Sequence, residues 1–149
     1  MHTVVTVFFS MALLSSFQGQ FPWELPPEAL YFSIANWGLF NIFEFGRKTF
    51  ASSEEREGVE SYSKVWTRVG AVVLVLGMAC ISTAFYSQIN FKASVNFQYA
   101  LIGFNVLMGA IGLAYLVTDG EPQAKIYRGM SSGYIVLVMV GLIALEQFA

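Results

Sequence analysis

Four long apolar segments with few charges constrain the fold of this chain more than any other feature. They cover residues 29–46, 65–87, 96–118 and 131–148, and each contains at most one charged residue. A transmembrane α-helix needs about 17–25 predominantly apolar residues to cross a bilayer. Each segment has this length. The pattern therefore predicts an all-α, polytopic transmembrane helical bundle with four membrane helices within residues 29–149.

The composition supports this class of protein. Hydrophobic residues make up 56% of the chain and charged residues 12%, whereas soluble domains have about 45–50% and about 25%. The net charge of −2 offers no basic surface for a phosphate backbone. We therefore expect membrane lipids as surroundings and no nucleic-acid partner, and we do not expect a soluble enzyme.

The cysteine and histidine content restricts the chemistry. Cys80 is the single cysteine and His2 the single histidine. One cysteine cannot form an internal disulfide, and one histidine cannot supply a bis-histidine haem or a histidine-rich metal site. We expect no cofactor, no metal ion and no catalytic residue.

The N-terminal region differs from the four segments. Residues 1–20 contain an apolar stretch of only 15 residues (3–17), which suits the core of a signal peptide or a short fifth membrane helix. A proline-rich linker follows at residues 21–28. Its last two prolines, Pro26 and Pro27, favour a helix that begins at Pro27 or Glu28.

The basic residues predict an orientation. Seven of the eight Lys and Arg residues lie in or beside the loops 47–64 and 119–130, and only Lys92 lies in the other connecting loop. Cytoplasmic loops carry an excess of basic residues. We therefore expect both of the more basic loops in the cytoplasm and the C-terminus on the extracytoplasmic or lumenal side.

Small residues predict how the helices pack. Gly70, Gly77 and Ala84 recur at intervals of seven residues in the second segment, and Gly103 and Ala110 repeat this spacing in the third. Small residues allow membrane helices to approach closely. The pattern predicts a tight antiparallel pair of these two helices, although glycine is also simply common in membrane helices.

Four polar side chains near or within the segments are candidate interaction sites. Asn36 and Asn105 lie at similar expected depths, which predicts a hydrogen bond between their helices; the alternative is a polar notch for a lipid headgroup or a sterol hydroxyl. Glu44 and Arg68 lie at the same end of adjacent helices, which predicts an ion pair. The alternative is that both stay solvated in the headgroup region.

Aromatic residues near the ends of the segments form a further pattern. Tyrosine and tryptophan side chains often anchor membrane helices at the interface. We expect this role for a set of aromatic residues that lie mostly near the ends. The set comprises Tyr31, Trp37, Trp66, Tyr86 and Tyr127.

One stretch of the second segment carries a family resemblance. Residues 68–87 begin with Arg68, followed by the small residues Gly70, Ala71 and Gly77. This arrangement, with three short connections between four helices, resembles DoxX-like small four-helix membrane proteins over about residues 29–145. The resemblance implies a helical bundle and no particular activity.

The expected function follows from the scarcity of reactive side chains. We expect a small integral membrane accessory, scaffold or assembly subunit without catalytic activity, whose partners are other membrane proteins or further copies of itself. One alternative is an oligomeric transporter or channel for a small solute, which would need a polar path through the membrane. Another is a lipid-binding or lipid-modifying membrane protein.

Overall fold

The computed structural model describes residues 3–55, 58, 60–89 and 94–148, and these residues form helices, turns and loops without a strand. The expected all-α class is confirmed. The elements are α1 (Thr3–Gln18), α2 (Pro27–Arg47), the 3₁₀ helix η1 (Ser52–Glu54), α3 (Tyr62–Val65), α4 (Thr67–Tyr86), α5 (Ser94–Thr118) and α6 (Glu121–Phe148).

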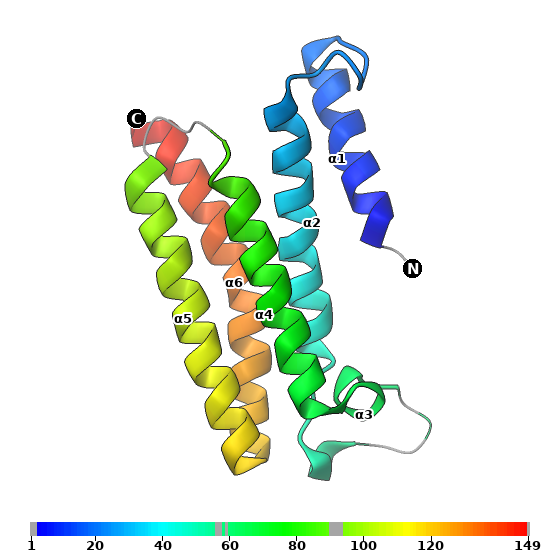
Figure 1. The fold of residues 1–149 in the computed structure, drawn as a ribbon, viewed down its shortest axis with the longest axis vertical. Coiled ribbons are helices and arrows are strands. Elements are labelled where there is room, and N and C mark those ends of the chain that lie inside the picture. Colours follow the sequence, from blue (N-terminus) through cyan, green and yellow to red (C-terminus); the bar gives the residue numbers. More distant parts are fainter. Residues whose placement is uncertain (1–2, 56–57, 59, 90–93, 149) are drawn as a thin grey trace.

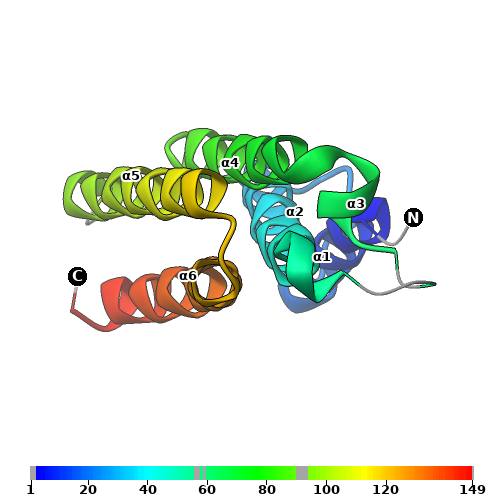
Figure 2. The ribbon, with the colours of Figure 1, turned by 90° about the horizontal axis from the view of Figure 1, so that it is seen from below.

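The four long helices α2, α4, α5 and α6 form an antiparallel bundle (Figure 1). Within it, α2 packs against α4 and α6, and α5 packs against the same two helices. Helix α1 lies outside this bundle and packs on α2 (Figure 2). The short helix α3 lies at the end of the bundle where α2 ends and α4 begins.

Three of the described helices, α4, α5 and α6, are long and apolar enough to cross a membrane. Helix α2 has 21 residues, but its apolar character is lowered by Asn36, Asn41 and Glu44. Helix α1 is apolar but has only 16 residues. The described part of the chain therefore contains three helices that could cross a membrane, in line with the apolar composition.

Helix α2 begins at Pro27, as the proline pair predicts. Pro26 is extended, with φ −63° and ψ 155°, and proline at the first helical position loses no intrahelical hydrogen bond because that N–H would have no partner. Helices α4 and α5 begin and end within two residues of the predicted segments.

The predicted loop at residues 119–130 is mostly helical, and this boundary is a correction. Helix α6 begins at Glu121, ten residues before the predicted start at position 131. Asp119 takes a left-handed conformation with φ 45°, so the turn from α5 to α6 needs only Asp119 and Gly120. The first turns of α6 are polar, and the apolar pattern did not include them.

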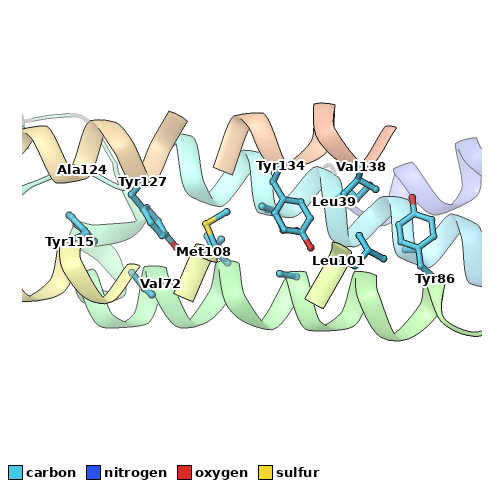
Figure 3. Close-up of a cluster of buried hydrophobic side chains, with 14 of the residues drawn as sticks. Leu39, Val72, Tyr86, Leu101, Met108, Tyr115, Ala124, Tyr127, Tyr134 and Val138 are labelled. Atoms are coloured by element: carbon cyan, nitrogen blue, oxygen red, sulfur yellow. The ribbon is translucent and has the colours of Figure 1, made fainter. Parts of the chain in front are cut away.

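The interior of the bundle is filled along its length by buried side chains, many of them aromatic (Figure 3). Tyr115 and Tyr127 stack with their ring centroids 5.6 Å apart. Tyr86 and Tyr127 are fully buried, which corrects the expectation that these two anchor the helices at the membrane surface. Aliphatic side chains such as Leu39 fill the space between the rings.

Helix α2 lies close to two neighbouring helices, and both close contacts occur at glycines. A Cβ atom on Gly38 would lie 3.0 Å from the backbone oxygen of Met78 on α4. A Cβ atom on Gly46 would overlap the side chain of Ser131 on α6. These contacts explain how α2 lies so close to both neighbours.

The small residues at heptad spacing on α4 and α5 do not lie between these two helices as predicted. A Cβ atom added to Gly77 or Gly103 would meet no described atom within 4 Å, apart from the nearby backbone of its own helix. Ala84 and Ala110 are exposed, and Gly70 lies nearest to side chains of its own helix. The heptad residues named above therefore do not form the expected contact between α4 and α5. The two helices approach closely at Gly112 instead, where an added Cβ would lie 2.9 Å from Val72 Cγ1 on α4.

Candidate functional site

A layer of hydrogen-bonded polar side chains crosses the interior of the bundle. Tyr86 donates its hydroxyl hydrogen to Asn36 Oδ1 at 2.9 Å. Asn105 donates from Nδ2 to Thr83 Oγ1 at 2.9 Å, and its Oδ1 accepts from the Tyr134 hydroxyl at 2.6 Å. Asn105 therefore links α5 to α4 and α6, and Asn36 links α2 to α4.

The predicted hydrogen bond between Asn36 and Asn105 is a second correction. Both side chains make hydrogen bonds between helices, as expected of polar groups in a membrane, but their partners are tyrosine and threonine hydroxyls. Helices α2 and α5 lie diagonally across the bundle, each packed against α4 and α6. Equal depth therefore did not make the two amides neighbours.

The predicted ion pair between Glu44 and Arg68 is also replaced by other pairs. Glu44 contacts Arg47 at 2.7 Å and Lys48 at 2.8 Å, one helical turn further along the chain. Arg68 contacts Asp119 at 2.6 Å. Glu44 thus finds its cations at the end of its own helix, and Arg68 finds its carboxylate at the end of α5.

The residues of this charged end were not singled out as a set by sequence reasoning. Arg128 on α6 donates two hydrogen bonds to the Glu54 carboxylate, at 2.8 and 2.7 Å, and one to the backbone oxygen of Thr49 at 3.0 Å. The side chains of Arg128 and Glu54 are only 17% and 15% exposed. Hydrogen bonds from Arg128 hold the pKa of the Glu54 carboxyl below its usual range. The guanidinium also lies over the ring of Phe50, 4.8 Å from its centroid.

Asp119 connects the same segment to α4 and α5. Its carboxylate accepts hydrogen bonds from the Ser52 backbone N–H at 3.2 Å and the Ser52 hydroxyl at 2.9 Å. These bonds, together with the nearby Arg68, hold the pKa of the Asp119 carboxyl below its usual range. Tyr115 donates to the backbone oxygen of Phe50 at 2.6 Å.

We call this network the end cap, because it ties the segment after α2 to the ends of the other helices. Its hydrogen bonds join positions 65 to 79 residues apart in the chain. Its carboxylates are occupied by cations and hydrogen-bond donors, which suits a structural role. The end cap consists of Thr49, Phe50, Ser52, Glu54, Arg68, Tyr115, Asp119 and Arg128.

Among the described residues, no group of three or more His, Cys, Asp or Glu side chains is arranged to hold a metal ion. Cys80 is exposed on α4.

A groove of about 400 Å³ lies on the outer side of the bundle between α1, α2 and α6. Its wall is almost wholly apolar, and it includes Asn36, whose amide oxygen takes part in the polar layer. The lining residues are Thr6, Ser10, Leu13, Leu14, Phe32, Asn36, Phe40, Ile135 and Met139.

Comparison with known proteins finds no matching family model, no matching curated protein and no matching solved structure. The resemblance to DoxX-like proteins therefore stays a prediction.

Proposed function

We propose that this chain is a small integral membrane scaffold or assembly subunit whose outward face on α4 binds another membrane helix. The observation that carries the proposal is the outward position of the small residues at heptad spacing. Gly77 has open space where a side chain would be, and Ala84, two helical turns further, is exposed. On α5, Gly103 and Ala110 are exposed as well.

Lipid tails are as apolar as leucine side chains, so helices in a membrane associate through close packing rather than through burial of apolar surface. Small residues permit this packing by letting two backbones approach. The bundle uses Gly38, Gly46 and Gly112 for its own close contacts. The outward small residues of α4 contribute to none of these contacts, and they suit a helix from another membrane protein or from a second copy.

The scaffold also requires a stable set of crossings, and we propose that α2 is the fourth. Its polar residue Asn36 is hydrogen-bonded to Tyr86, and Asn41 donates from Nδ2 to the backbone oxygen of Trp37 at 2.7 Å. Asn41 is 1% exposed. Since both amides make hydrogen bonds and Asn41 is buried, α2 can be less apolar than its neighbours and still lie in a bilayer.

The same contacts favour a scaffold over a transporter. A solute path would need polar groups that face a shared passage. Asn36, Asn41 and Asn105 instead make hydrogen bonds within the bundle, and Glu44 is paired with cations at the end of α2.

The test is affinity purification of the full chain in mild detergent, with the bound proteins identified by mass spectrometry. We expect a stoichiometric membrane-protein partner; a well-behaved homo-oligomer without one would favour the oligomeric transporter instead. Gly77→Ile should lower recovery of the partner about tenfold, since loss of close packing is worth about 1.4 kcal/mol or more.

The matched control is Gly133→Ile on α6. A Cβ on Gly133 also meets nothing within 4 Å, but this glycine lies outside the small-residue stripe of α4. Recovery should be unchanged in this variant. A monomeric chain without a stoichiometric partner, or equal recovery with both variants, would contradict the proposal.

A further inference from the structure

The groove between α1, α2 and α6 contains polar groups that the bundle itself does not use. Thr6 and Ser10 on α1 and Asn36 on α2 line it. Within the described residues, the hydroxyls of Thr6 and Ser10 have no hydrogen-bond partner, and the amide of Asn36 uses only its oxygen, which accepts from Tyr86. The Nδ2 group of Asn36 is therefore free to donate.

These groups lie deep within the apolar part of the molecule. At a rise of about 1.5 Å per residue, Ser10 lies about 12 Å from the end of α1, and Asn36 lies about 14 Å from the start of α2. The two helices meet in a hairpin, so the two positions have similar depths (Figure 1). Unpaired donors at such a depth are costly in hydrocarbon because no water can pair with them.

Within the polar layer, Asn105 shows how such a cost is avoided. Asn105 uses both its Nδ2 and its Oδ1 atoms in hydrogen bonds with neighbouring helices. Asn36 lies in the same polar layer and lines the groove, and no described residue accepts from its Nδ2. Other unpaired polar atoms of the described bundle, such as Ser82 Oγ and the Tyr127 hydroxyl, are buried. Asn36 differs from them because it lines a groove, so a ligand bound there can reach its donor.

The wall of the groove restricts the chemistry of that partner. No charged side chain lines it, so an ionised headgroup would lie there without a counterion. The remaining wall consists of aliphatic and aromatic side chains, among them Phe32 and Phe40. Its volume of about 400 Å³ is within the range of small-molecule sites, about 300–1,000 Å³.

We propose that this groove binds a neutral membrane lipid that carries a carbonyl oxygen, with the hydrocarbon body against the apolar wall and the oxygen accepting from Asn36 Nδ2. The hydroxyls of Ser10 and Thr6 provide further donors. A phospholipid does not fit this description, because its charged headgroup belongs at the membrane surface and not at the depth of Asn36. The site is independent of the outward face of α4.

The experiment uses the full chain in phosphatidylcholine vesicles with three photoreactive probes. One is a long-chain ketone with a diazirine in its chain, the second is the matching hydrocarbon without the ketone, and the third is phosphatidylcholine with the same diazirine. After illumination, labelled peptides are located by mass spectrometry. We expect the ketone to label residues of α1 and α2 several-fold more than either other probe. Equal labelling by the three probes would show ordinary lipid contact and overturn the proposal.

Two pairs of variants separate binding from folding. Asn36→Leu should lower ketone labelling about fivefold, the value of one hydrogen bond. Tyr86→Phe removes the same interhelical hydrogen bond but keeps the Asn36 donor, so its labelling should persist. Equal losses in both variants would show that the effect is structural and would overturn the proposal.

The second pair tests the wall provided by α1. Ser10→Trp fills the groove and should abolish ketone labelling, whereas Ala12→Trp places the same side chain at an exposed position outside the lining and should leave it intact. The mass of the purified chain completes the test. Removal of residues 1–20 from the mature protein would remove this wall and overturn the proposal.

Discussion

Two glycines determine how closely α2 lies against its neighbours. At Gly38, the nearest atoms to an added Cβ are 3.0 Å away and belong to the Met78 backbone oxygen and the Ser82 side chain. At Gly46, the Ser131 side chain occupies the same space. A backbone atom or a buried side chain cannot move aside without shifting a helix, so the absence of a side chain at these positions is a packing requirement.

The first prediction concerns Gly46→Ala. The added methyl group should overlap Ser131 and lower the free energy of unfolding by about 2 kcal/mol, as overpacking of a well-filled interior does. Thermal unfolding of the detergent-solubilised chain measures the loss. Gly77→Ala is the control, because its methyl group meets open space and alanine is the better helix former. A Gly46→Ala variant as stable as Gly77→Ala would contradict the packing.

The second prediction concerns the polar layer. The hydrogen bond between Tyr86 and Asn36 should give a coupling energy of about 0.6 kcal/mol in a cycle of Tyr86→Phe and Asn36→Leu. Asn105 has other partners. The effects of Asn36→Leu and Asn105→Leu should therefore add within about 0.5 kcal/mol. Coupling between the two asparagines larger than that with Tyr86 would contradict the observed pairing.

At the scale of elements, the segment after α2 is held by hydrogen bonds rather than by a regular structure. Apart from the three residues of η1, positions 48–55 form no helix. Backbone oxygens of Thr49 and Phe50 accept from Arg128 and Tyr115, and Glu54 holds Arg128 by two further hydrogen bonds. The stability of this segment therefore depends on the charge of Glu54.

The third prediction follows from that dependence. Because the pKa of Glu54 is lowered in the folded chain from its ordinary value of 4.5, its contribution is complete above that pH. It is lost as the pH falls through the lowered pKa. Glu54→Gln should destabilise the chain by about 2 kcal/mol at pH 7, and its stability should decline less between pH 5 and pH 3 than that of the unaltered chain.

Thermal unfolding across this pH range measures both effects. Glu60→Gln is the matched control, because Glu60 is exposed and has no described hydrogen bond in the end cap. It should retain the stability and the acid sensitivity of the unaltered chain. An identical acid response in Glu54→Gln would show that another group controls this segment.

The helices themselves were largely predictable from the apolar pattern. Length and hydropathy located α4 and α5 within two residues, because a membrane helix must be continuously apolar. The start of α6 was missed because the first turns, which include Lys125 and Arg128, lie at the charged end of the bundle. A search for apolar segments does not detect the first turns of a helix when these turns are polar on several sides.

The contacts between helices were much less predictable. Depth along a helix can be counted, and Asn36 and Asn105 do belong to one polar layer, but the rotation of each helix about its axis determines which side chains meet. Tyr86 and Tyr134 complete that layer from inside the bundle. The end cap was not predictable either, because it depends on which helix ends meet. Its partners Arg128 and Glu54 are 74 residues apart in the chain.

At the scale of the whole molecule, the basic residues gather at one end. Arg47 and Lys48 lie at the end of α2, Arg68 at the start of α4, and Lys125 and Arg128 in the first turns of α6 (Figure 1). Several are paired with acidic residues of the same end. These ion pairs do not cancel the bias in orientation, because the excess of Lys and Arg determines topology and acidic residues contribute little. Lys92 and Arg56, which belong to the same count, lie outside the described residues.

The fourth prediction is therefore that this end faces the cytoplasm. In a Cys80→Ser background, Ser53→Cys places a thiol on η1 beside the basic residues, and Gln88→Cys places one just beyond α4 at the opposite end. Both positions are exposed. A membrane-impermeant maleimide added to intact cells or sealed vesicles should label Gln88→Cys directly and Ser53→Cys only after permeabilisation. The opposite pattern would place the end cap outside the cytoplasm, and direct labelling of both would mean that α4 does not cross the membrane.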